Sequence, residues 1–78
     1  MENKSIIPII ESKYDSFTNT EKTVADFFIH NTEQIDFSAS NISKIIFTSE
    51  AALSRFARKC GYSGYREFKY LYERSLAG

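Results

Sequence analysis

Cationic side chains that can bind anions gather in the last third of the chain. They are Arg55, Arg58, Lys59, Arg66, Lys69 and Arg74. A guanidinium group offers two parallel N–H donors, which fit phosphate oxygens or the O6 and N7 atoms of guanine. Residues 51–78 hold six cations against two glutamates, a net charge of +4, whereas residues 1–50 hold four lysines against eight acidic residues, a net charge of −4. This asymmetry indicates an anionic partner, although a pair of solvated helix faces would give the same totals.

The spacing of residues 51–60 places the first of these cations on one side of a helix. Apolar side chains recur at helical spacing along one face, at Leu53, Phe56, Ala57 and Cys60. The opposite face repeats this spacing with small, polar and then basic side chains, at Ala51, Ser54, Arg55 and Arg58. Small residues at the start of a helix let it enter the major groove of DNA closely, and arginine can reach a base edge or a phosphate. The pattern predicts a DNA-reading helix, with an ordinary amphipathic surface helix as the alternative.

The residue types that catalysis requires do not come together in this sequence. We find no nucleophile–base pair, metal-ligand cluster or phosphate-binding glycine loop, so we expect no enzyme, metal or cofactor. His30 stands alone near the end of a predicted helix, where a capping role suits it. The single cysteine, Cys60, forms no internal disulfide and favours a reducing, cytoplasmic setting. No apolar run reaches the roughly 18 to 20 residues of a membrane span, and the first residues lack the order of a signal peptide.

The length and the apolar periodicity predict one small all-α domain. Its five short helices are expected over residues 6–14, 19–30, 39–46, 50–60 and 65–76. The expected start and stop signals are Ser5 and Pro8 for the first helix, the capping box from Thr18 to Glu21 for the second, Ser38 and Ser49 for the third and fourth, and Gly61 at the end of the fourth. A domain of this size has a core that gives only marginal stability.

Two of these helices, joined by a three-residue turn, form a helix-turn-helix unit over about residues 39–60. In its first helix Ile42, Ile45 and Ile46 are expected to face inward. The connection that precedes it, residues 32–37, is expected to contain a short helical turn at residues 33–36. Phe47 stands in the turn of the unit where many such turns carry glycine, so it needs either an ordinary backbone conformation or some strain.

Three segments carry a resemblance to a known family. They read TNTEKTVADF over residues 18–27, SASNI over residues 38–42 and TSEAALSRFARKCGYSGYREFK over residues 48–69. The third is the most specific, because it combines Ser49 and the Arg55-Phe56 pair with a run of arginine, lysine, glycine and tyrosine. The chain resembles the N-terminal domain of the RpiR family of bacterial sugar-metabolism regulators over about two thirds of its length.

The resemblance implies a homeodomain-like helix-turn-helix fold that binds double-stranded operator DNA as a homodimer and regulates transcription. It also implies a C-terminal sugar-isomerase-type domain that senses a phosphosugar. Because the chain stops at Gly78, we expect residues 1–78 to be the excised N-terminal fragment of a longer regulator. Ser54 departs from the family pattern, which leads us to expect a β-branched apolar residue, and Glu50 suits the helix dipole but repels phosphate.

The candidate site residues follow from this interpretation. Arg55 and Arg58 are expected at base edges; Ser49, Ala51, Ala52 and Ser54 at the closest approach to DNA; and Lys59, Tyr62, Tyr65, Arg66 and Lys69 at the phosphate backbone. Ile6, Ile7 and Ile10 are expected to form the dimer interface, because they give more aliphatic surface than a short helix needs. A helical protein–protein interaction module without DNA binding is the alternative, although it has no need to gather arginines on a solvent face.

Overall fold

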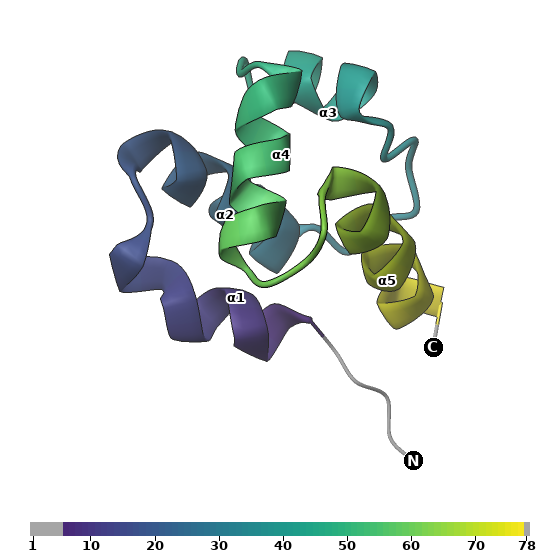
Figure 1. Ribbon diagram of the computed structural model, residues 1–78. Helices are drawn as coiled ribbons and strands as arrows, with labels where there is room; N and C mark the ends of the chain where they lie inside the picture. Colours follow the sequence, from purple (N-terminus) through teal and green to yellow (C-terminus); the bar gives the residue numbers. More distant parts are fainter. Residues whose placement is uncertain (1–5, 78) are drawn as a thin grey trace.

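The computed structural model describes residues 6–77, which fold into five α-helices and one 3₁₀ segment (Figure 1). The helices are α1 (Ile7–Lys13), α2 (Asn19–His30), α3 (Ala39–Ile45), α4 (Glu50–Lys59) and α5 (Tyr65–Ala77), and the 3₁₀ segment Tyr14–Ser16 follows α1. Because no strand occurs within residues 6–77, the predicted all-α class is confirmed. None of the helices in this range is long and apolar enough to cross a membrane.

Helix α4 lies in the middle of the molecule, in contact with α2, α3 and α5 (Figure 1). Helix α3 lies at the N-terminal end of α4, while α1 packs against α2 at the opposite end of the molecule. Pro8 occupies the first turn of α1 as predicted, and Ser5, the expected cap of that helix, lies outside the described residues. Helix α4 therefore has support on three sides, and its remaining side faces outward.

Polar side chains begin three of the helices, as the sequence predicts. Thr18 Oγ1 accepts a hydrogen bond from the Glu21 backbone N–H at 3.2 Å, and the Glu21 carboxylate accepts one from the Thr18 N–H at 2.8 Å. This is a complete capping box, which satisfies two N–H groups that the helix leaves unpaired. Ser38 and Ser49 cap α3 and α4 by accepting the N–H three residues further on, at 3.3 and 3.1 Å.

Helices α3 and α4 each end in a turn with the same pattern of backbone hydrogen bonds. After α4, the N–H groups of Gly61 and Tyr62 reach back three and five residues to carbonyl oxygens, at 3.0 and 3.1 Å; after α3, those of Phe47 and Thr48 do the same at 3.4 and 2.9 Å. This pair of bonds is the Schellman motif, whose first residue beyond the cap takes a left-handed conformation. Gly61 has φ +104° and Phe47 has φ +55°, and within residues 6–77 Phe47 is the one non-glycine residue with a positive φ. Phe47 therefore takes the strained alternative that the sequence left open.

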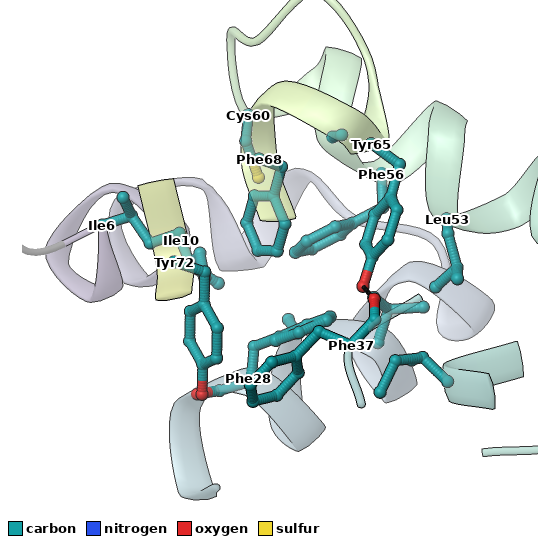
Figure 2. Close-up of a cluster of buried hydrophobic side chains, with 14 of the residues drawn as sticks. Ile6, Ile10, Phe28, Phe37, Leu53, Phe56, Cys60, Tyr65, Phe68 and Tyr72 are labelled. Atoms are coloured by element: carbon teal, nitrogen blue, oxygen red, sulfur yellow. Dashed lines mark hydrogen bonds between the residues drawn. The ribbon is translucent and has the colours of Figure 1, made fainter. Parts of the chain in front are cut away.

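Aromatic rings from several segments fill the core (Figure 2). The ring of Phe28 on α2 lies 4.8 to 6.4 Å, centroid to centroid, from the rings of Phe37, Phe56, Tyr65, Phe68 and Tyr72. Full burial of such a ring contributes roughly 1.5–3 kcal/mol. The cluster joins α2, α4 and α5, so the rotation of α4 about its own axis is fixed by the core.

Two buried tyrosine hydroxyls hold α5 against α2 and the segment that follows it. The Tyr65 hydroxyl donates to the Phe37 carbonyl oxygen at 2.6 Å, and the Tyr72 hydroxyl donates to that of Phe28 at 2.8 Å. Figure 2 shows the Tyr65 hydroxyl meeting the Phe37 backbone. A buried carbonyl without a partner is costly, so these bonds stabilise both α5 and the connection before α3.

Residues 33–36 do not form the predicted helical turn. Side chains satisfy the nearby backbone groups instead: Asn31 Nδ2 donates to the Glu33 carbonyl oxygen at 2.9 Å, and Asp36 Oδ1 accepts from the Ser38 N–H at 3.0 Å. Asparagine and aspartate commonly compete with helix formation in this way. The connection is consequently extended, and it leads directly into the cap of α3.

The inward face of α3 is narrower than predicted. Ile42 is fully buried and Ile46 is half-buried, but Ile45 is 43% exposed. Ile42 and Ile46 lie one helical turn apart on the side of α3 that packs against the core, and Ile45 lies at the edge of that side. The expectation that all three isoleucines face inward is corrected for Ile45.

Helix α1 uses most of its apolar surface within the domain. Ile6 is 3% exposed, Ile10 is fully buried, and Ile7 is half-buried against the same core. Ile6 and Ile10 therefore have no surface to offer to a second copy, and their assignment to a dimer interface is corrected. The physical reason is the size of the domain, because α1 must cover α2 with the few apolar side chains that a seven-residue helix carries. Ile9, at 38% exposed, is the large apolar side chain that α1 leaves at the surface.

Candidate nucleic-acid interface

Helix α4 has one buried and one exposed face, as its spacing predicts. The buried face consists of Leu53, Phe56, Ala57 and Cys60, none more than 4% exposed. On the opposite face Ala51, Arg55 and Arg58 are exposed and Ser54 is half-buried. Because the ring of Phe56 packs against those of Phe28 and Phe68, the outer face of α4 is held in one orientation.

The guanidinium groups of Arg55 and Arg58 are available to an external partner. Within residues 6–77, neither side chain forms an ion pair or a hydrogen bond. Arg74 on α5 differs, since its Nη1 donates to the Tyr70 hydroxyl at 3.1 Å and its guanidinium lies 5.6 Å from the centre of the Tyr70 ring. The two arginines of α4 keep their full capacity to donate to phosphate or to a base edge.

The side chains at the start of α4 lie partly at the surface and partly in the core. Ser49 and Glu50 are exposed, and so is Ala51, whose methyl group is small enough to let another molecule approach the helix closely. Ser49 Oγ accepts the Ala52 N–H, which leaves its own proton free for an external acceptor. Ala52 is 2% exposed, so its assignment to the surface that approaches DNA is corrected. The inner stripe of α4 begins at Ala52, one residue before the position that the spacing identified.

The two tyrosines assigned to phosphate contacts have different environments. Tyr65 is 7% exposed, and its only hydroxyl proton is donated to the Phe37 carbonyl oxygen. Phosphate oxygens accept hydrogen bonds and cannot donate them, so the assignment of Tyr65 to phosphate is corrected. Tyr62 is half-buried, with its ring edge against Phe68 at 5.8 Å. Burial raises the pKa of the Tyr62 hydroxyl, which therefore stays protonated and able to donate.

A surface pocket beside Ser54 brings α3, α4 and α5 together. It is lined by Ser38, Ala39, Ser54, Tyr65, Arg66 and Lys69. Arg66 is exposed, and Lys69 Nζ lies 3.5 Å from Glu73 Oε1, a pair one helical turn apart that contributes only about 0.3–0.5 kcal/mol. Both cations can therefore turn to an external anion. The sequence interpretation missed Ser38 and Ala39 at this place, because their only signal was the capping position at the start of α3.

Lys59 is less available than the other predicted cations. Its Nζ lies 3.0 Å from Glu21 Oε1, and Glu21 is 8% exposed. Burial alone would raise the pKa of Glu21, but the Thr18 backbone N–H and the Lys59 ammonium outweigh it and hold the pKa below its ordinary value. Lys59 thus neutralises a buried carboxylate and ties the end of α4 to the capping box of α2.

Residues 6–77 contain no group of three or more His, Cys, Asp or Glu side chains that could hold a metal ion.

Comparison with known proteins agrees with this geometry. The sequence profile of the helix-turn-helix domain of the rpiR family matches residues 4–78. The chain is 36% identical over 74 residues to an uncharacterized HTH-type transcriptional regulator of Thermotoga maritima, an alignment that covers 92% of this chain and 26% of that protein. It is 33% identical over 75 residues to the HTH-type transcriptional regulator HexR of Pseudomonas aeruginosa, which covers 95% of this chain and 26% of that one.

These relatives are much longer than the domain described above, since the chain spans about a quarter of the length of each. The match nevertheless covers almost the whole of this chain, and α3 and α4 are two helices joined by a short turn, the arrangement of a helix-turn-helix unit. Helix-turn-helix domains of transcriptional regulators bind DNA through the second helix of that unit. The chain belongs to the RpiR family of helix-turn-helix transcriptional regulators.

Proposed function

We propose that this domain recognises operator DNA by placing α4 in the major groove, with Arg55 and Arg58 directed to base edges or flanking phosphates. One observation carries the proposal: the outer face of α4 presents two arginines without partners inside residues 6–77, and the exposed side chains before them in the first turn are the methyl group of Ala51 and the carboxylate of Glu50 at its start. A bidentate contact from arginine to guanine is the commonest specific contact in this groove. Because the core fixes the opposite face of α4, the reading face is in place before DNA binds.

The surrounding polar groups suit the sugar-phosphate backbone. Arg66 and Lys69 line one pocket with Ser38 and Ser54, and Ser49 keeps a proton that a phosphate oxygen can accept. Such contacts set the position and register of a protein on the duplex, while base contacts give the specificity. Bound cations release condensed counterions, so affinity should fall steeply as the salt concentration rises. An affinity that stays flat across a salt titration would contradict this assignment.

The reading face can be tested with a duplex that the purified domain selects from a random-sequence library. Arg55→Ala should lower the affinity for this duplex by about 1–3 kcal/mol, and it should leave the helical circular dichroism and the melting temperature nearly unchanged. Arg74→Ala is the matched control, because it removes the same charge from an arginine that is occupied by Tyr70. We expect that control to bind nearly as the parent domain does.

The outcomes separate four explanations. A loss at Arg55 that is larger for the selected duplex than for a scrambled one supports base reading, and an equal loss supports a phosphate contact. Unchanged affinity in Arg55→Ala with an intact fold would show that the wrong face of α4 has been assigned to the groove. If the folded parent domain enriches no duplex at all, the alternative of a protein–protein interaction module would take its place.

We further propose that the regulator binds DNA as a homodimer and responds to a phosphosugar through a region outside these 78 residues. The resemblance to sugar-metabolism regulators supports the effector, and the much greater length of the relatives leaves room for a sensing region. Two recognition helices that read successive half-sites would lie about 34 Å apart. Sedimentation with a selected palindromic duplex should give two domains per duplex, and a ratio of one would contradict the pairing.

A further inference from the structure

Phe47 combines two unfavourable features in one residue. Its side chain is 94% exposed, the highest value among the exposed large apolar residues of the described chain, and its backbone takes φ +55°. Glycine or asparagine in this position of the turn would avoid both the exposed ring and most of the strain. Backbone strain in a residue other than glycine clusters at sites that bind a partner, so the strained and exposed Phe47 indicates an external contact.

The place of Phe47 identifies the surface that it joins. It lies two residues before the Ser49 cap of α4 and four before Ala51, an exposed residue of the first turn. The α3–α4 turn lies at the end of the molecule where α4 begins, far from α1 (Figure 1). The first turn of a recognition helix is the part that meets base edges. Phe47 therefore borders the proposed DNA-reading surface.

The turn also holds the backbone of Phe47 in a fixed position relative to α4. The N–H groups of Phe47 and Thr48 are both bonded to carbonyl oxygens of α3, at 3.4 and 2.9 Å. The next residue, Ser49, is bound in turn to the first turn of α4 through its side chain. A ring that projects from such a turn can meet one defined position on the duplex.

The chemistry of the ring selects the partner. A phenyl ring cannot read hydrogen-bond donors or acceptors through its edge, and the major groove presents one apolar group, the C5-methyl of thymine. We propose that Phe47 packs against a thymine methyl at the border of the site read by α4 and is thereby a specificity-determining residue. This inference rests on the proposed function, because it requires α4 to lie in the major groove.

The test compares the duplexes selected by the parent domain and by Phe47→Asn, which tolerates the left-handed conformation and should melt near the parent temperature. The variant should lose the preference for thymine at one border position. In the parent-selected duplex, replacing that thymine by deoxyuridine removes only the methyl group. The parent domain should then bind about four-fold more weakly, as expected for one buried methyl group. Phe47→Asn should bind both duplexes equally.

Two further variants keep this result separate from the proposed function. Ile9→Asn replaces another exposed apolar residue, at the opposite end of the molecule, and should discriminate thymine from deoxyuridine as the parent does. Arg55→Ala should bind both duplexes more weakly but keep their ratio. If Phe47→Asn retains the full discrimination, the inference fails even where Arg55→Ala weakens binding. If Phe47→Asn instead alters only the sedimentation of the free domain, the ring contacts a second copy, and the thymine assignment is overturned.

Discussion

The ends of α3 and α4 close with the same pair of backbone hydrogen bonds around different residues. Gly61 holds the left-handed position after α4, and Phe47 holds it after α3. The next residue after Gly61, Tyr62, packs against Phe68, whereas Phe47 has almost its whole side chain in solvent. The residues of the α4–α5 turn thus suit the fold alone. The α3–α4 turn instead holds a strained backbone and an exposed ring at the border of the proposed DNA-reading face.

This difference shows that hydrogen bonding sets the backbone conformation of such a turn. A residue type that does not suit this conformation then indicates a requirement other than folding. A Cβ atom added at Gly61 would meet nothing within 4 Å, so space does not require glycine there. The left-handed backbone conformation alone favours glycine at Gly61, and it favours glycine at Phe47 as well. Substituting Gly61 should therefore lower the stability of the domain, whereas replacing Phe47 by glycine should not.

The largest expected effect comes from the core that both turns share. Phe56→Ala should destabilise the domain by about 3–5 kcal/mol, a large part of the stability of a small domain, because it removes a fully buried ring beneath α4. Urea denaturation followed by circular dichroism measures the loss, and amide hydrogen exchange shows which turn opens. Loss of protection at one turn while the other stays closed would show that the two ends do not belong to one cooperative unit.

Substitution at Gly61 should have the next largest effect. Gly61→Val forces a β-branched residue into φ +104° and should cost about 1–2 kcal/mol in thermal or urea denaturation. Gly64→Ser is the matched control, because Gly64 also has free space around a Cβ position but no left-handed φ. That control should stay within about 0.5 kcal/mol of the parent domain. Equal losses in both variants would contradict the conformational explanation.

Phe47→Gly should act in the opposite direction from Gly61→Val. Removal of the left-handed strain stabilises the domain, and the greater freedom of glycine in the unfolded chain offsets part of that gain. We expect a change between zero and about 1 kcal/mol of added stability, measured by urea denaturation. A loss of more than 1 kcal/mol would show that the ring stabilises the fold itself, and the contrast between the two turns would no longer hold.

The smallest expected effect is a dependence on pH at the contact between the C-terminal end of α4 and the capping box of α2. The pKa of Glu21 is lowered in the folded protein, so its contribution is present above the ordinary glutamate value near 4.3 and is lost as pH falls through the lower folded value. Acidification should therefore destabilise the folded domain through this group. Glu21→Gln should remove that part of the pH dependence, and an unchanged acid profile in the variant would contradict the assignment.

Much of the fold follows from local patterns. The bounds of α2, its capping box and the inner stripe of α4 were predicted correctly, because they depend on residues within one or two helical turns. Other assignments failed where a distant segment decides. Tyr65 gives its proton to Phe37, which lies 28 residues earlier in the chain, and no local spacing reveals that acceptor.

The errors at the edges of stripes have a related cause. Helical spacing identifies the centre of a buried face, but neighbouring elements set how far the face extends, so Ala52 joined the core and Ile45 left it. Counting aliphatic residues assigns Ile6 and Ile10 to a second copy, but both side chains are buried within the domain. The structure shows instead how little apolar surface a domain of this size has to spare.

The position of Cys60 has a practical consequence for spectroscopy. The side chain is 4% exposed, and burial raises the pKa of the thiol to about 11, so almost no thiolate is present in the folded protein at neutral pH. A second cysteine placed on the exposed Ser63 by Ser63→Cys should therefore take a maleimide fluorophore alone, without removal of the native cysteine. Cys60 itself would then be labelled only in molecules whose fold has transiently opened. The slow rate of this reaction would measure the fraction of opened molecules.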